Sequence, residues 1–306
     1  MLSYLQAIIL GIVQGVTELF PVSSLGHSVL LADLFGWTNL SRQQTAHASD
    51  FLTLLVMMHV ATAIALLVFY RVQWVRIVKG FFRSLKTKRL AGDSDAKLAW
   101  LLIVATIPGG LFGLLFDHTL RAEFATAFFA IIFITLNGII LLKGDKLITK
   151  AELARPRQRR DANADELTVS KTARVVSDHL TFERAGFIGL VQIGAFFAGL
   201  SRSGLTMLAG LRSGLDHQDA ARFSFLLTTP IIFLAGIYKL PSVLGSAGAH
   251  IRGQILVGSL LAGGFAYLSV RFLDKYFRNK SLRPFGWYCI GFGIFMLLFS
   301  IIKGAP

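Results

Sequence analysis

Six apolar segments, each about as long as a membrane is thick, constrain this chain more than any other feature of its sequence. They cover residues 51–70, 98–116, 124–142, 223–240, 253–270 and 285–302. A helix needs about 20 consecutive apolar residues to cross the hydrocarbon core of a bilayer. Only 16% of all residues are charged, whereas about a quarter are charged in an average soluble domain. The sequence therefore predicts an all-α polytopic membrane protein with six transmembrane helices.

Basic residues are distributed unevenly among the connections between these segments. Three stretches hold 23 of the 31 Lys and Arg residues, with 8 in 71–97, 10 in 143–184 and 5 in 271–283. An excess of Lys and Arg marks cytoplasmic loops, so these stretches are expected inside and both termini outside. The net charge of +14 therefore does not indicate a nucleic-acid partner, which would require basic residues on one folded face, interleaved with aromatic ones.

Two further apolar stretches fit this membrane topology only if each returns to the side of the membrane from which it entered. Residues 1–47 start and finish outside, and residues 186–218 start and finish inside. Such re-entrant backbone is tolerated where protein or a water-filled cavity surrounds it. The sequence therefore predicts two re-entrant helical hairpins, at 2–36 and 186–214, in addition to the six spans.

The two predicted hairpins resemble each other in sequence. GIVQGVTELFPVSSLG (11–26) aligns without a gap with GLVQIGAFFAGLSRSG (189–204), and Gly11, Gln14, Ser23 and Gly26 pair with Gly189, Gln192, Ser201 and Gly204. Inverted repeats with broken helices are a known membrane architecture, with the binding site at the repeat interface. We therefore predict an inverted-topology repeat of two halves, 1–142 and 185–306, each with one hairpin and three spans. A polar cytoplasmic linker at 143–184 is expected to join them.

Each predicted hairpin contains a residue that breaks a helix. Pro21 cannot continue the turn that precedes it, and Gly199 lies at the corresponding position of the second hairpin. Ser23 or Ser24 is expected to cap the second half-helix of the first hairpin, and Ser201 to open that of the second. Two half-helix N-termini would then point at one central spot, where exposed N–H groups and helix dipoles attract an anion.

The first hairpin is expected to bring acid, base and nucleophile to that spot. Gln14 and Glu18, spaced i and i+4, share one helix face, and Ser24 and His27, spaced i and i+3, share another. His27 can activate the Ser24 hydroxyl as a nucleophile for phosphoryl transfer. Glu18 would repel a phosphate unless it binds a bridging divalent cation or handles a proton.

The second hairpin is expected to supply the groups that bind the anion. Arg202 carries a planar, fork-shaped cation that suits phosphate oxygens. Hydrogen bonds can come from the hydroxyl groups of Ser201, Ser203 and Thr206. Gly204 lies in the first turn of the same half-helix. This half would therefore stabilise the charge that develops in a transition state.

Polar residues inside a membrane also have structural uses. Gln14 and Ser23 are equally expected to hold helices together through hydrogen bonds, and His59 in LVMMHVAT is expected to pack or to form a hydrogen bond. Glu18 and Arg202 differ, because a charged side chain in the membrane costs several kcal/mol and by default indicates function.

Several of these motifs resemble those of the undecaprenyl-diphosphate phosphatases of bacterial inner membranes. Gln14 and Glu18 in QGVTE match the family's (E/Q)xxxE motif, and Ser24 and His27 in PVSSLGH match its PVSSTGH stretch. The second motif of the family, PGxSRSxxT, is matched by Gly199, Ser201, Arg202, Ser203 and Thr206. Two positions depart from the family pattern, because Ala198 replaces the leading proline and Leu25 replaces a threonine.

The resemblance implies an activity, a cofactor and a location. It implies hydrolysis of undecaprenyl diphosphate to the monophosphate, which recycles the carrier lipid for cell-wall synthesis and is associated with bacitracin resistance. It also implies dependence on a divalent cation, Mg²⁺ or Ca²⁺, and a site that opens to the periplasmic side of the inner membrane. The alternative is a carrier that moves a prenyl phosphate across the bilayer, since inverted repeats are typical of transporters. Whether Ser24 or His27 is the nucleophile, and whether the protein forms a homodimer, are left open by the sequence.

Overall fold

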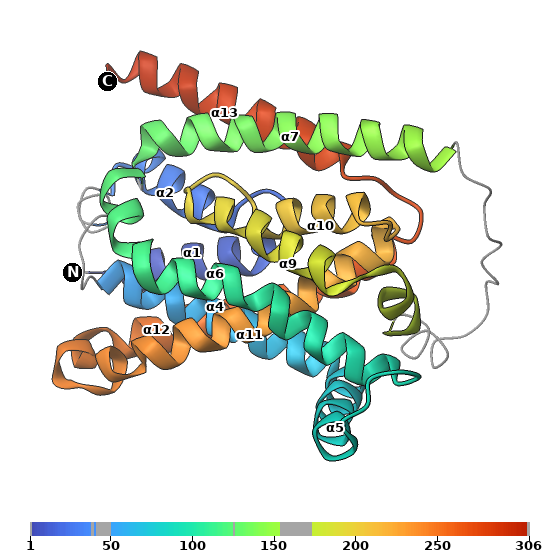
Figure 1. Cartoon of the computed structure of the whole chain (residues 1–306). Helices are drawn as coiled ribbons and strands as arrows, with labels where there is room; N and C mark the ends of the chain where they lie inside the picture. The colour runs from blue at the N-terminus through green and yellow to red at the C-terminus, as the bar shows by residue number, and fades with distance from the viewer. Residues whose placement is uncertain (1, 38–39, 41–49, 125, 154–172, 305–306) are drawn as a thin grey trace.

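The structure is a computed structural model that describes residues 2–37, 40, 50–124, 126–153 and 173–304. All regular secondary structure in these residues is helical (Figure 1). Six of these helices are long and apolar enough to cross a membrane. They are α4 (Asp50–Phe69), α6 (Ser94–Phe124), α7 (Ala127–Leu153), α11 (His217–Leu244), α12 (Arg252–Tyr276) and α13 (Arg283–Ile302). Each contains one of the six predicted spans or nearly all of it. The predicted all-helical fold is therefore confirmed, and the six predicted spans coincide with helices that are long and apolar enough to cross a membrane.

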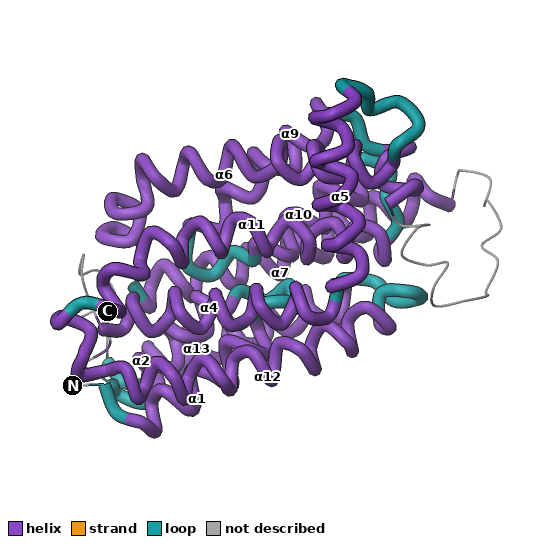
Figure 2. Tube along the Cα trace, turned by 90° about the horizontal axis from the view of Figure 1, so that it is seen from below, coloured by secondary structure: helices purple, strands orange, loops and turns teal. Residues whose placement is uncertain are grey.

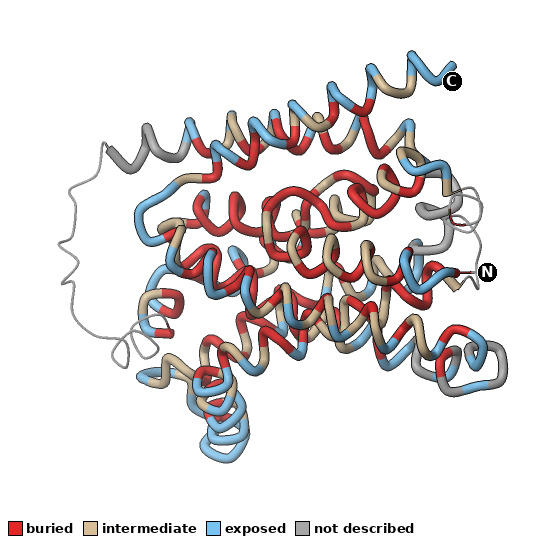
Figure 3. The backbone as a smooth tube through the Cα atoms, turned by 180° about the vertical axis from the view of Figure 1, so that it is seen from behind, coloured by how far each residue is buried: buried red, intermediate tan, exposed pale blue. Residues whose placement is uncertain are grey.

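Two broken helix pairs lie inside the bundle that the long helices form. The first is α1 (Tyr4–Thr17) with α2 (Ser24–Leu34), and the second is α9 (Phe182–Val191) and the 3-10 helix η1 (Gln192–Phe196) with α10 (Arg202–Arg212). In Figure 1 these short helices lie between a layer of α7 and α13 and a layer of α4, α6, α11 and α12. Their residues are largely buried, as the red tube in the centre of Figure 3 shows. The predicted breaks are therefore present, and both lie in the protein interior.

The helix that follows each break has a serine as its N-cap. Ser23 is the N-cap of α2, and its Oγ accepts a hydrogen bond from the Gly26 N–H at 3.3 Å. Ser201 is the N-cap of α10, and its Oγ accepts from the Gly204 N–H at 3.2 Å. A serine at this position satisfies one of the unpaired N–H groups of the first helical turn. The capping that the sequence predicted is confirmed, with Ser23 rather than Ser24 as the cap of α2.

Small residues allow α1 to lie directly against α12 (Figure 2). A Cβ atom on Gly11 would lie 2.5 Å from the Gly258 carbonyl oxygen, and one on Gly15 would lie 2.5 Å from the Ala262 carbonyl oxygen. Helices in a membrane associate through such close packing, because lipid provides no hydrophobic driving force between them. The close contact fixes the position of α1, which carries the first functional residues.

A buried ion pair joins three long helices at the end of the bundle from which α5 (Arg71–Thr87) extends. Arg222 of α11 donates to both carboxylate oxygens of Asp274 of α12, from Nε at 2.7 Å and from a terminal nitrogen at 3.1 Å. The hydroxyl of Tyr70, between α4 and α5, donates to the same carboxylate at 3.3 Å. Because a buried charge is tolerated when it is paired and hydrogen-bonded, this cluster ties α4, α11 and α12 together.

The polar stretch at 143–184 differs in part from the predicted linker. Its first residues continue α7 as far as Leu153, residues 154–172 lie outside the described residues, and Ala173 and Val176 are buried in a short helix. The buried Asp145 accepts from His217 Nε2 at 2.8 Å and from the Leu282 N–H at 3.1 Å. Polar residues at the end of α7 thus pack because they are paired, which the composition of the stretch did not reveal.

Candidate active site

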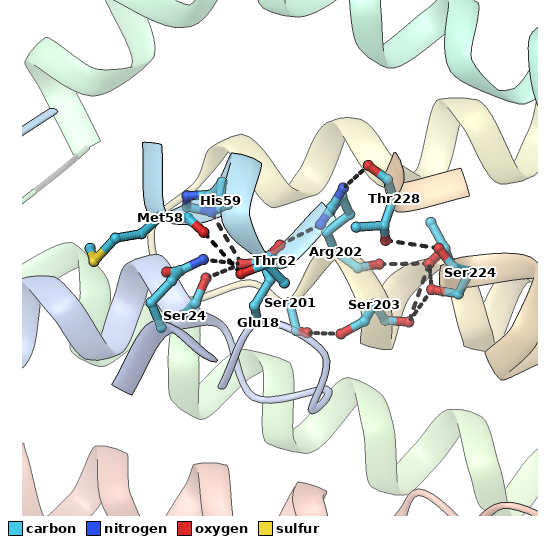
Figure 4. Close-up of polar contacts among 12 residues, drawn as sticks. Glu18, Ser24, Met58, His59, Thr62, Ser201, Arg202, Ser203, Ser224 and Thr228 are labelled. Carbon is cyan, nitrogen blue, oxygen red and sulfur yellow. Dashed lines mark hydrogen bonds and ion pairs between the residues drawn. The ribbon is translucent and has the colours of Figure 1, made fainter. Parts of the chain in front are cut away.

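The carboxylate of Glu18 lies at the centre of a buried polar cluster (Figure 4). Its Oε1 accepts a hydrogen bond from the guanidinium of Arg202, at the start of α10. Its Oε2 accepts from Gln14 Nε2 at 3.0 Å and from the Ser24 hydroxyl, and lies 3.1 Å from His59 Nε2. Side chains from α1, α2, α4 and α10 therefore meet at one carboxylate that is 8% exposed.

The pairing of Glu18 with Arg202 explains how two charges persist in the interior. The two side chains come from different broken helix pairs and are 184 positions apart in the sequence. Burial of either charge alone would cost several kcal/mol, whereas the ion pair with further hydrogen bonds lowers that cost. The sequence predicted a buried arginine opposite a buried glutamate, and the structure places them in direct contact.

His59 contacts the cluster although the sequence indicated only a packing or hydrogen-bonding role. Its Nδ1 lies 2.7 Å from the Leu55 carbonyl oxygen and its Nε2 lies 3.1 Å from Glu18. Both neighbours are oxygen atoms that accept hydrogen bonds. The expected hydrogen bond is present, but the contact with Glu18 was missed. An ionisable residue inside an apolar span was the signal that could have found it.

The first break has a backbone conformation that few residues adopt. Ser23 has a φ of 71°, in the left-handed region, and this costs a non-glycine residue about 1–3 kcal/mol. Its hydroxyl compensates by accepting from the Gly26 N–H and, at 3.2 Å, from the Gly199 N–H in the second break. Gly199 has a φ of 118°, and a Cβ atom there would lie 2.7 Å from the Ala130 carbonyl oxygen. Glycine is therefore required where the two breaks meet.

Asn137 of α7 joins the two breaks and was not singled out by the sequence. Its Nδ2 donates to the Pro21 carbonyl oxygen at 3.0 Å, and its Oδ1 accepts from the Ser201 N–H at 3.0 Å. The Ser203 hydroxyl adds a bond to the Phe20 carbonyl oxygen at 3.1 Å. These bonds hold the starts of α2 and α10 next to each other, where unpaired N–H groups and helix dipoles favour an anion.

A pocket at this cluster has both polar and apolar lining residues. The polar ones are Glu18, Ser23, Ser24, His59, Gln192, Ser201 and Arg202. Its other walls are mainly apolar and come from α4, η1 and α11, with Leu52, Leu55, Val56, Phe196, Ile231, Ile232 and Ala235 among the residues that line them. The arrangement suits an amphiphile whose charged group contacts Arg202 while its apolar part follows the walls.

The expected hydrogen bond between Ser24 and His27, which are both among the described residues, is not formed. His27 Nδ1 lies 2.7 Å from the Ser23 carbonyl oxygen, and its Nε2 lies 2.8 Å from the hydroxyl of Tyr288 on α13. The ring stacks on Phe292, with 4.8 Å between the ring centroids. Helical spacing placed the two residues on one face of α2, but Ser24 turns to Glu18 while His27 turns to α13. Neither His27 nor Gln14 is among the residues that line the pocket.

Three residues predicted to bind substrate make contacts with protein around the second break. Ser203 bonds the Phe20 carbonyl oxygen, and the Thr206 hydroxyl lies 2.6 Å from that of Ser224 on α11. A Cβ atom on Gly204 would lie 3.2 Å from Pro21. These three residues are not among those that line the pocket, so their observed contacts are with protein.

The oxygen atoms near Glu18 are compatible with a cation that binds together with a phosphate. Gln14 Oε1 is buried and has no hydrogen-bond partner among the described residues, and it belongs to the amide that donates to Glu18. The described residues contain no group of three or more His, Cys, Asp or Glu side chains that could hold a metal. Mg²⁺ is commonly held by one or two carboxylates together with substrate phosphates and water. Glu18 and Gln14 are the residues here that could hold such a cation.

Comparisons with known proteins show the family to which the chain belongs. Residues 7–295 match the family model described as bacitracin resistance protein BacA. The undecaprenyl-diphosphatase of Mycolicibacterium paratuberculosis is 47% identical, with 94% of each chain covered. Undecaprenyl-diphosphatase 2 of Frankia alni is 45% identical, with 94% of this chain and 95% of the relative covered. Undecaprenyl-diphosphatase 2 of Chromobacterium violaceum is 41% identical, with 97% and 99% covered. This multi-pass membrane protein belongs to the bacitracin resistance protein BacA family.

Proposed function

We propose that the protein hydrolyses undecaprenyl diphosphate to undecaprenyl phosphate and inorganic phosphate. The observation that carries this proposal is the buried pocket in which the Ser24 hydroxyl and Arg202 both contact Glu18 beside apolar walls. A hydroxyl, a carboxylate and a fork-shaped cation are the groups that phosphoryl transfer uses. The relatives named undecaprenyl-diphosphatase, at 41–47% identity over almost the whole chain, support the identity of the substrate.

We propose that Ser24 attacks the terminal phosphorus atom and that Glu18, rather than His27, accepts the serine proton. The Ser24 hydroxyl already donates to Glu18. A diphosphate that enters the pocket would compete with Glu18 for Arg202, and its negative charge would draw the guanidinium away. Glu18 would then lose a donor that stabilises its charged form and become a better proton acceptor. The bond between the phosphorus and the bridging oxygen breaks, undecaprenyl phosphate leaves, and water hydrolyses the phosphoserine.

A divalent cation, Mg²⁺ or Ca²⁺, is proposed to bind with the substrate. Glu18 and the unpaired Oε1 of Gln14 would hold it. When bound, such a cation neutralises charge on the phosphate oxygens. Arg202 and the N-termini of α2 and α10 would act on the same negative charge from the protein side.

The matched sequences and serine caps of the two breaks support a proposal about topology. We propose that the broken pairs are re-entrant hairpins of an inverted repeat, with halves 1–142 and 185–306 joined by the linker at 143–184. Matched serines, Ser23 and Ser201, begin the second helix of each pair. With the basic connections on the cytoplasmic side, both termini and the mouth of the site would lie on the periplasmic side of the inner membrane.

The proposed function is tested by phosphate release from undecaprenyl diphosphate by the purified, full-length protein. We expect one equivalent of inorganic phosphate per lipid, and loss of activity when EDTA removes divalent cations and its recovery when Mg²⁺ is added back. A protein that only transports a prenyl phosphate needs no serine hydroxyl hydrogen-bonded to a carboxylate, and it would release no phosphate. Movement of the lipid across vesicle membranes without phosphate release would therefore contradict the hydrolase and support the carrier.

Arg202→Lys tests the proposed phosphate contact. Lysine keeps the positive charge but loses the planar fork that binds two oxygens, and loss of one well-placed donor costs about 10²–10³ in rate. We expect turnover to fall by that factor, with Arg202→Ala lower still. Arg212→Lys, an exposed position in the same helix, is the matched control and should retain full turnover.

A purely structural Arg202 gives a different result in the same experiment. Arg202→Ala would then lower the melting temperature more than the turnover of the folded protein, and a further Glu18→Gln change would partly restore stability. A folded Arg202→Ala protein with near-normal turnover would contradict the proposed phosphate contact.

A further inference from the structure

The helix α5 lies between the ends of two spans and is not itself a span. It begins at Arg71, two positions after α4 ends at Phe69, and α6 begins at Ser94. Its axis runs across the direction of the long helices, at the lower right of Figure 1. A helix that starts where a span leaves the hydrocarbon, and that runs across that span, lies at the level of the lipid headgroups.

One face of α5 packs on the protein. This face consists of Gln73, Ile77, Gly80 and Ser84, all of which are buried. A Cβ atom on Gly80 would lie 2.6 Å from the Ala96 nitrogen of α6, so the two helices approach closely there. Trp100 of α6 adds a hydrogen bond from Nε1 to the Ser84 hydroxyl at 3.0 Å. The helix is therefore held in one orientation, which fixes the directions of its other faces.

Two further stripes run along α5, each with the spacing of a single helix face. The apolar stripe consists of Val75, Val78, Phe82 and Leu85, which are 46–63% exposed. The basic stripe, one position further along at every step, consists of Arg76, Lys79, Arg83 and Lys86. The helix thus exposes apolar and basic surface side by side.

The charge of the basic stripe is only partly neutralised by the protein. Arg76 Nε lies 3.1 Å from Asp95, and Arg83 Nε lies 2.5 Å from Asp93. These are the only two acidic residues among 71–97, a stretch that holds eight Lys and Arg residues. Lys79 and Lys86 lie on the exposed surface between the paired arginines and the apolar stripe.

We propose that α5 binds anionic phospholipid headgroups through Lys79 and Lys86, with its apolar stripe inserted among the acyl chains below them. Apolar side chains on one face and lysines beside them are the features by which an interfacial helix binds a negatively charged membrane. In the proposed topology the lipids belong to the cytoplasmic leaflet, whose surface is negative. The surface is thus distinct from the pocket around Glu18 and takes a different class of lipid.

A fluorescent label on Phe82→Cys tests this proposal in the full-length protein. Cys289, the single native cysteine, is buried, so a thiol-reactive nitrobenzoxadiazole dye labels position 82. The protein is placed in phosphatidylcholine nanodiscs that contain a fixed fraction of spin-labelled phosphatidylglycerol or spin-labelled phosphatidylcholine. We expect quenching by both lipids, with stronger quenching by phosphatidylglycerol because it is enriched at α5.

Lys79→Gln/Lys86→Gln should remove this preference. One basic residue at an anionic surface contributes about a factor of five in affinity, so the double variant should lower the local enrichment by up to about 25-fold. Lys275→Gln/Lys280→Gln, which removes the same charge from two exposed positions in another basic stretch, is the matched control and should keep the preference.

Three outcomes would overturn the proposal. Equal quenching by the two lipids in the protein with unchanged lysines would show that α5 does not select anionic lipid. Absence of quenching by either lipid would place α5 in water. Loss of the preference on addition of excess soluble glycerol phosphate would indicate binding of a free headgroup without insertion into the membrane.

Discussion

Glu18→Gln is expected to lower the turnover of undecaprenyl diphosphate by about 10⁴-fold while the protein stays folded. A general base contributes roughly 10²–10⁴ in rate, and Glu18 is also the proposed cation ligand. Glutamine retains the shape of the side chain, and its single carbonyl oxygen can still accept from one of the two donors, Ser24 or Arg202. It can neither take the serine proton nor supply a negative charge to a cation. The measurement is phosphate release at saturating lipid over a range of Mg²⁺ concentrations.

Asp33→Asn is the matched control for Glu18→Gln. It makes the same carboxylate-to-amide change near the far end of α2, where Asp33 pairs with Lys303 at 3.4 Å outside the pocket. This variant should retain full turnover. Wild-type turnover of Glu18→Gln at every Mg²⁺ concentration would show that the carboxylate is neither base nor cation ligand.

Ser24→Ala is expected to lower turnover by 10⁴-fold or more with little change in KM, because removal of a catalytic nucleophile affects the chemical step rather than binding. Acid quenching of the wild-type reaction should trap a phosphate ester on Ser24, which mass spectrometry of proteolytic peptides locates. Ser28→Ala is the matched control. Ser28 lies one turn further along α2, and its buried hydroxyl has no hydrogen-bond partner among the described residues.

The same trapping experiment decides between Ser24 and His27. A phosphohistidine at His27 that persists in Ser24→Ala would transfer the nucleophile to the histidine. We expect none, since both ring nitrogens of His27 are engaged by the Ser23 carbonyl and Tyr288.

Properties of single residues and of continuous segments could be predicted from the sequence. The six apolar helices follow from apolar length alone. Pro21 and Gly199 favour the two breaks, because proline disrupts the helical turn before it and glycine adopts backbone conformations that other residues rarely adopt. The serine caps follow from the unpaired N–H groups at every helix start. Glu18 and Arg202 were identified because a charge inside an apolar segment is costly unless it has a function.

Contacts between helices could not be predicted in this way, because spacing along one helix fixes a face and not what packs against it. Ser24 and His27 share a face of α2, yet one meets Glu18 and the other meets Tyr288 on α13. His59 reaches Glu18 only because α4 packs beside α1.

The sequence by itself thus determined the six apolar helices, the two breaks and the presence of Glu18 and Arg202 in the interior, but not the buried pair of Arg222 and Asp274. The tertiary structure alone decided the partners of Glu18 and the bridge that Asn137 makes between Pro21, 116 positions before it, and Ser201, 64 positions after it. The physical reason is that helix formation and membrane insertion depend on local composition. A hydrogen bond between side chains depends on distances of about 3 Å, which only the packing of distant helices sets.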